Sequence, residues 1–298
     1  MMRLLRHCLL LMLMWPLTAL CAGDIVLTAA QGSTAVRDFV EALRKQRPAD
    51  QVRFVRVAQL PAPDRLKADT RLILLDTAAL DWRLTQAAGP PALALRVTRV
   101  QADRRLGGLR PAYLSLLWSD PPLSRQLRLI HYLLPQARRI GVLYAEHSSF
   151  LLDELRRAAR PLGLEVVAQA WPDTRDSRPV QAVLKDSDVL LGLDDTQLYN
   201  PHTAKNLLLS SYARQVPLIG PNAGFVRAGG LASTLSDQQD WLAVLERLLD
   251  QPPALWPREH YPEHFRVIGN AQVARALGIE AIDPVAAQQA VAAGEIHP

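Results

Sequence analysis

The stretch RRIGVLYAEHSSFLLDELRRAARPLGLEVVAQAW, residues 138–171, decides the fold. An apolar strand and its loop over 138–147 are followed by a helix over 148–163, whose start Ser148 or Ser149 can cap. A second apolar strand closes the stretch. A strand, a helix and a strand of these lengths form a right-handed βαβ unit, which places the two strands parallel in one sheet.

The same alternation continues in both directions along the chain. Strand patterns occur at 24–30, 52–58, 71–76, 92–97, 113–119, 189–195 and 217–220. Helical spacing of apolar residues separates several of them, as at 34–46, 122–135, 178–188 and 201–215. These strands are too many for one compact sheet. We therefore predict an α/β protein of two doubly wound parallel-sheet, Rossmann-like domains joined by a hinge.

The N-terminal residues differ from the rest of the chain. Arg3 and Arg6 precede an apolar run that is too short to span a bilayer, a pattern typical of a secretory signal peptide. We expect cleavage after Ala22 and export to the periplasm. Lipid attachment at Cys21 is the alternative, and it is disfavoured because Leu20 stands where a small residue is wanted.

Cysteine usage and charge exclude several classes of function. Both cysteines, Cys8 and Cys21, lie in the predicted leader, so the exported chain has no disulfide, thiol nucleophile or thiolate metal ligand. The net charge of +5 falls to +3 without Arg3 and Arg6. The remaining arginines are scattered, which argues against nucleic-acid binding. The sequence contains no phosphate-binding GxGxxG or GxxxxGK[ST] motif and no GxSxG elbow, so we expect neither an enzyme nor a cofactor.

The predicted division of the chain follows the order of these elements. It comprises a signal peptide over 1–22, a first lobe over 23–119 completed by about 234–250, a second lobe over 120–233, and a segment over 251–298 that returns across the hinge. The stretch WSDPPLS, residues 118–124, is the expected first link between the lobes. Short, direct links of this kind form a hinge with a cleft beside it.

Polar residues that follow the predicted strands are the candidate ligand contacts, because ligands of open parallel sheets bind at the carboxyl ends of the strands. They are Gln31, Gly32, Ser33, Asp76, Thr77, Ser119, Asp120, His147, Ser148, Asp194, Asp195, Thr196 and Asn222. The same residue types cap helices, so each position is either a cap or a contact. The gathering of several such loops favours a binding site.

Two chemical alternatives use residues of the same loops. His147, Ser148 and Asp194 are the residue types of a catalytic triad, but these types often occur together in α/β loops. The stretch EHYPEH, 259–264, holds two histidines four residues apart, although Pro262 argues against the helix that would align them. A metal or metal-chelate binder remains an alternative, and no metal ligand is assigned.

The second part of the chain, from Gln136 to about Asp283, resembles the substrate-binding proteins of ABC transporters, in particular the tryptophan/tyrosine-type family with the type I periplasmic-binding fold. The motifs that carry the resemblance are LLPQARRIGVLY (133–144), RRAARPLGLEVV (156–167), VLLGLDDT (189–196), ARQVPLIGPNAGFVRAGGLAS (213–233) and FRVIGNAQVARALGIE (265–280). Each motif is weak alone, but the five occur in the family's order.

The resemblance implies a monomer that captures a small-molecule solute between its domains and delivers it to an ABC permease in the inner membrane. A sensory or receptor-associated module with the same fold is the alternative. Amino-acid-binding members tend to have an acidic residue where this chain has Asn222, so Asp194, Asp195 or Asp76 would have to supply the charge. The adjacent glycines Gly229 and Gly230 are expected to let the backbone bend or take a positive φ near a domain junction.

Overall fold

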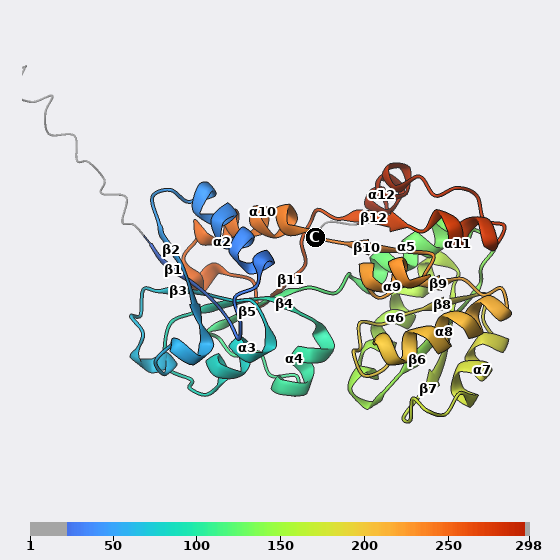
Figure 1. Cartoon of the computed structure of the whole chain (residues 1–298), viewed down its shortest axis with the longest axis horizontal. Helices are drawn as coiled ribbons and strands as arrows, with labels where there is room; N and C mark the ends of the chain where they lie inside the picture. The colour runs from blue at the N-terminus through green and yellow to red at the C-terminus, as the bar shows by residue number, and fades with distance from the viewer. Residues whose placement is uncertain (1–22, 296–298) are drawn as a thin grey trace, which may run out of the picture.

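The structure is a computed structural model that describes residues 23–295, so the predictions about the leader lie outside the described residues. Two six-stranded sheets, each flanked by helices, form two lobes that lie side by side in Figure 1. This arrangement confirms the predicted α/β class. Within residues 23–295, no helix combines the length and the apolar character needed to cross a membrane.

The first sheet is parallel throughout and has the order β11-β5-β4-β3-β1-β2. Its strands are β1 (Asp24–Ala29), β2 (Gln51–Arg56), β3 (Arg71–Leu74), β4 (Ala92–Val97), β5 (Leu114–Trp118) and β11 (Glu259–His260). The flanking helices are α2 (Thr34–Gln46), α3 (Thr77–Leu84), α4 (Arg99–Leu106) and α10 (Gln238–Leu249). The order in which strands are added reverses at β1, because β2 lies on one side of β1 whereas β3, β4 and β5 lie on the other. Doubly wound sheets bind ligands at such a switch point, which here lies between β1 and β3.

Both faces of the first sheet are buried, which explains the nearly continuous apolar runs of its strands. Ile25 and Leu27 belong to a core formed with α2 and α10. Val26, between them, belongs to a core formed with α3 and α4. Successive side chains of a strand point to opposite faces, so one strand contributes to both cores.

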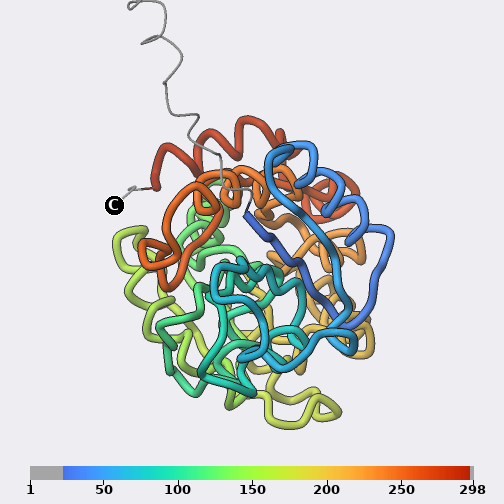
Figure 2. Tube along the Cα trace, turned by 90° about the vertical axis from the view of Figure 1, so that its left-hand side faces the viewer, coloured from blue at the N-terminus to red at the C-terminus, as the bar shows by residue number. Residues whose placement is uncertain are grey.

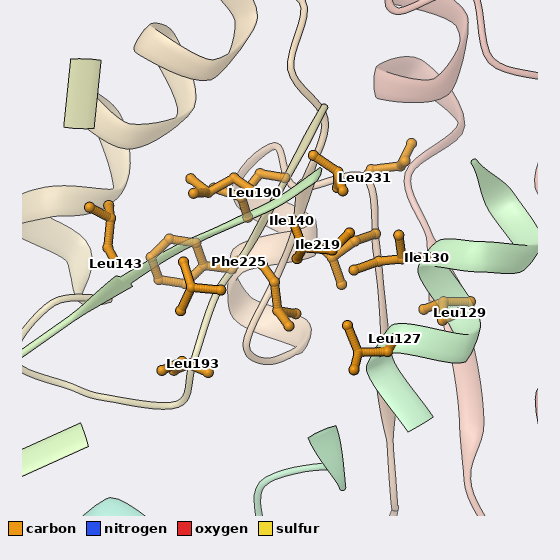
Figure 3. Close-up of a cluster of buried hydrophobic side chains, with 14 of the residues drawn as sticks. Leu127, Leu129, Ile130, Ile140, Leu143, Leu190, Leu193, Ile219, Phe225 and Leu231 are labelled. Atoms are coloured by element: carbon orange, nitrogen blue, oxygen red, sulfur yellow. The ribbon is translucent and has the colours of Figure 1, made fainter. Parts of the chain in front are cut away.

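The second sheet has the order β12-β10-β9-β8-β6-β7, with β12 as an antiparallel edge strand. Its strands are β6 (Arg139–Tyr144), β7 (Glu165–Ala170), β8 (Val189–Leu191), β9 (Leu218–Ile219), β10 (Ala232–Leu235) and β12 (Arg266–Gly269). Its helices are α5 (Leu123–Leu133), α6 (Leu151–Ala159), α7 (Arg178–Lys185), α8 (Pro201–Ala213), α9 (Ala223–Ala228), α11 (Ala271–Ala276) and α12 (Pro284–Ala293). Figure 3 shows Ile140, Leu190 and Ile219, from three neighbouring strands, in the core of this lobe.

Three connections link the two sheets. The chain passes from β5 to α5, from β10 to α10, and from β11 to β12, so α10 and β11 return to the first lobe before the chain ends on the second. The end-on view of Figure 2 shows the first lobe, in blue to cyan, in front of the second. Three short connections restrict the relative motion of two such lobes to a hinge.

Two local predictions about loops have different outcomes. The helix α6 begins at Leu151, and no side chain caps it, so the prediction that Ser148 or Ser149 caps this helix is wrong. Gly229 has φ of +134°, which confirms the expected bend, because a residue with a Cβ is strained in that conformation. The following strand β10 leads directly into the second connection between the lobes.

Candidate functional site

Two partly buried carboxylates lie where the lobes meet. Asp120 follows β5 of the first sheet and accepts a hydrogen bond from the backbone N–H of Arg99 at 2.9 Å. Asp194 follows β8 of the second sheet and accepts from the side-chain amide of Asn222 at 3.4 Å. Burial raises the pKa of Asp120 to about 7, and the negative charge of nearby Asp194 adds to the rise. Two acids from different sheets therefore share one poorly solvated region.

The pKa of the Asp194 carboxyl is also raised, to about 6. Burial is the main cause, the hydrogen bond from Asn222 opposes it, and the charge of Asp195 adds to it. The ionised form of a carboxylate in this position is stabilised by any cationic or hydrogen-bond-donating group that replaces the water removed by burial. An ammonium or a similar donor beside Asp120 or Asp194 would therefore stabilise the ionised carboxylate.

Asp195 is completely buried and already fully engaged within the protein. Its Oδ2 accepts from the Ser148 hydroxyl at 2.7 Å, and its Oδ1 accepts from the backbone N–H of Gln197 at 3.0 Å and from Arg104 Nη2 at 3.1 Å. Ser148 is buried as well, and its Oγ accepts from the backbone N–H of Ala145. These contacts explain why Ser148 is not free to cap α6.

Two of the candidate residues of the first lobe cap helices of that lobe. Ser33 caps α2 by accepting from Val36, and Asp76 caps α3 by accepting from Ala79. The second oxygen of Asp76 accepts from the backbone N–H of Ala30 at 2.8 Å and so joins the ends of β1 and β3. Gln31 and Gly32 are exposed beside Ser33, and Thr77 is half-buried beside Asp76. Within residues 23–295, no hydrogen bond or ion pair joins Gln31, Gly32, Ser33, Asp76 or Thr77 to the second lobe.

The remaining candidates are dispersed. His147 and Thr196 are exposed. The Ser148 hydroxyl donates to Asp195 and not to His147, so His147, Ser148 and Asp194 do not form a catalytic triad. Ser119 lines a cavity of about 10 Å³ at the hinge, together with Asp120 and Tyr261, and this volume holds no more than one water molecule. The structure thus brings together Asp120, Ser148, Asp194, Asp195 and Asn222 but not the other candidates.

Comparison with known proteins finds a family that part of this chain resembles. The model of the family "ABC transporter substrate binding protein" matches residues 119–242, which run from the first connection through β10 into α10. No curated protein sequence matches the chain. The predicted resemblance to ABC transporter substrate-binding proteins is confirmed.

Solved structures agree with this assignment at the level of the fold. An ABC domain from Streptococcus pneumonia in complex with L-Trp is 18% identical, with 90% of this chain and 98% of that chain covered and a TM-score of 0.60. A ligand-free, open substrate binding protein with adhesive properties from Clostridium difficile is 19% identical, with 88% and 97% covered and a TM-score of 0.67. A conserved domain protein from Vibrio cholerae is 17% identical, with 90% and 98% covered and a TM-score of 0.60. The tryptophan/tyrosine type remains a prediction, because identities this low show only the shared fold.

Three residues at the junction between the lobes were not predicted from the sequence. Arg99 and Arg104 lie on α4, and Tyr261 lies on the third connection. Arg99 donates to the Tyr261 hydroxyl at 3.5 Å and pairs with Glu154 of the second lobe at 2.7 Å. The available signal was the capping box that starts α4 directly after β4, since a helix start at a strand's carboxyl end belongs to the ligand-binding edge.

The geometry of a metal site, the alternative suggested by the sequence, is not found among the described residues. Among residues 23–295, no three His, Cys, Asp or Glu side chains are grouped so that they could hold a metal ion. In EHYPEH, His260 contacts Arg247 and Glu263 pairs with the same arginine. Arg247 thus occupies the acceptors that a metal would need there.

Proposed function

We propose that the protein is an exported solute-binding protein that captures a small molecule between its two lobes and delivers it to an ABC permease in the inner membrane. The observation that carries this proposal is the pair Asp120 and Asp194, two partly buried carboxylates that follow strands of different sheets and are near enough for the charge of Asp194 to raise the pKa of Asp120. Such a pair is costly without a partner, and a bound cationic group would offset the cost.

The polar set around Asp194 fits a ligand with a hydrogen-bond-donating, positively charged end. Asp194 and Asp120 supply negative charge, and Asn222 holds Asp194 in place from the start of α9. We therefore propose a solute with an ammonium or similar group, which includes but does not require an amino acid. The candidate contacts of the first lobe, Gln31, Ser33 and Thr77, would meet the other end of the solute on closure.

The three connections between the two lobes support a hinge mechanism. We propose lobes made of 23–119 with 234–250 and of 120–233, with 251–298 returning across the hinge. A solute that touches both lobes binds the closed arrangement better than the open one, so binding shifts the population towards closure. We further propose that the protein acts as a monomer in the periplasm and that the permease recognises the closed form.

A thermal-shift screen of the purified mature protein tests this function. Amino acids, polyamines, nucleosides, sugars and metal chelates are the ligand classes, and a solute at about 100 times its Kd should stabilise the protein by about 2.7 kcal/mol. The variant Asp194→Asn should lose this stabilisation. The variant Asp186→Asn should keep it, because Asp186 is exposed at the end of α7 in the same lobe.

The screen also has an outcome that would refute the function. If no solute stabilises the protein and none changes its radius in small-angle scattering, a transport role is wrong. A solute that contains a metal and binds equally well to Asp194→Asn would instead favour the metal-chelate alternative.

A further inference from the structure

The helix α4 of the first lobe reaches the second lobe through two arginines. Arg104 Nη2 lies 3.1 Å from Asp195 Oδ1 and 3.2 Å from Gln197 Oε1. Arg99, at the start of the same helix, lies 2.7 Å from Glu154 Oε2. Figure 1 shows α4 as the part of the first lobe that extends towards the second.

The second lobe presents Asp195 as a preformed receptor for the arginine. The carboxylate is completely buried, and Ser148 and the backbone N–H of Gln197 fix its orientation. These two neutral donors leave its negative charge uncompensated within its own lobe. A buried carboxylate without a counter-charge is unfavourable, so the guanidinium of Arg104 is worth more here than in an exposed pair.

Arg99 makes the second contact between α4 and the second lobe. The guanidinium of Arg99 lies 5.6 Å from the centre of the Phe150 ring, in addition to its ion pair with Glu154. Its side chain is only 15% exposed, so the attraction is weakly screened by solvent. Both arginines thus join the lobes through protein groups alone.

We propose that Arg104 and Asp195 form a clasp that favours the closed arrangement of the lobes and thereby sets the affinity for the solute. Arg104 reaches Asp195 in the arrangement of the lobes seen here, and an opening that moves α4 away from the second lobe would leave the buried carboxylate without its cation. The apparent Kd equals the intrinsic Kd divided by the fraction of closed molecules, so a clasp that enriches the closed form tightens binding without touching the solute. The effect on affinity rests on the proposed function, whereas the effect on lobe closure does not.

The neighbouring Arg105 provides a matched control on the same helix. Its guanidinium pairs with Asp81 of α3, within the first lobe, at 2.6 Å. Arg105→Gln removes one positive charge from α4, as Arg104→Gln does, but breaks no contact between the lobes. A difference between the two variants therefore reports the clasp and not the net charge or the helix.

The test measures the distance between the lobes by single-molecule fluorescence energy transfer, without added solute. Residues 23–298 contain no cysteine, so Lys45→Cys on α2 and Lys185→Cys on α7 give one dye on each lobe. We expect Arg104→Gln to shift molecules from the high-transfer to the low-transfer population. Arg105→Gln should resemble the unsubstituted protein, and Arg104→Lys should restore part of the closed population because it keeps the charge.

Each possible result decides the proposal. Equal distributions for Arg104→Gln and Arg105→Gln would overturn the clasp, and circular dichroism with urea unfolding confirms that both variants are folded. Once a solute is found, its Kd should rise about tenfold in Arg104→Gln and stay unchanged in Arg105→Gln. An unchanged Kd together with a shifted population would overturn the role in affinity. Failure to find any solute refutes the proposed function and leaves the distance measurement valid.

Discussion

The side-chain amide of Asn222 lies 3.4 Å from Oδ1 of Asp194, while its own oxygen accepts from the backbone N–H of Phe225 and caps α9. One residue therefore holds a helix start and a buried acid in a fixed relation. Asn222 therefore supports an acid at the end of the neighbouring strand β8.

Replacing Asn222 by alanine should affect both roles. Loss of the cap should lower the free energy of unfolding by about 1 kcal/mol, and loss of the amide should raise the pKa of Asp194 further and weaken solute binding. Urea unfolding and calorimetric titration measure the two effects. Asp283→Ala is the control, since the Asp283 carboxylate caps α12, away from Asp194 and α9, so this variant should lose stability but not binding. Equal binding losses in the two variants would contradict the role of Asn222.

The stability of the protein should depend on Asp120 above pH 4. Its pKa is raised from 3.8 in the unfolded chain to about 7 in the folded state, so the folded protein binds the proton more tightly. The stability from this group is therefore complete below about pH 4 and is lost as the pH rises through about 7. Asp120→Asn should be more stable than the unsubstituted protein by on the order of 1 kcal/mol at pH 8. Urea unfolding should show no such gain near pH 4; equal gains at both values would contradict the assignment.

Gln126 should be essential to the second sheet, because its side chain is the partner of several buried groups. Its amide donates to the carbonyl of Gly220 and the hydroxyl of Ser233, and its oxygen accepts from the backbone N–H and hydroxyl of Thr234. Gln126→Leu leaves these groups unsatisfied and should cost about 2–3 kcal/mol in urea unfolding. Gln136→Leu, at an exposed position, should cost little. A small loss in Gln126→Leu would show that water replaces the side chain.

The C-terminal segment should stabilise the second lobe through Glu295. Its carboxylate pairs with Arg125 at 2.5 Å, and Arg125 is 5% exposed and lies 4.0 Å from the centre of the Phe265 ring. Glu295→Ala leaves a buried cation without its partner and should lower the free energy of unfolding by about 3 kcal/mol. The exposed Glu280 has no ion pair among the described residues, so Glu280→Ala should be nearly neutral. Similar thermal unfolding of the two variants would refute this role.

The candidate site was only partly predictable because polar loop residues have several possible roles. Ser33, Asp76 and Asn222 are caps, as their type and their place before a helix allowed. Ser148 was expected to be a cap and instead donates to Asp195, from a loop 47 positions away in sequence. A local pattern cannot distinguish these outcomes, because Asp195 is distant in the sequence. The free-energy cost of leaving the buried Asp195 carboxylate without donors exceeds the gain from capping a helix with Ser148.

The sequence by itself determined the two-lobed α/β architecture, because the period of apolar residues fixes which segments become strands and helices and the length of the helices fixes parallel pairing. It also determined the edges of the sheets at which polar residues gather. Only the tertiary structure decided which of those residues meet. The pairing of Arg104 with Asp195 and the approach of Asp120 to Asp194 depend on how two lobes close around three connections, and charge interactions across such a junction leave no periodic pattern in the chain.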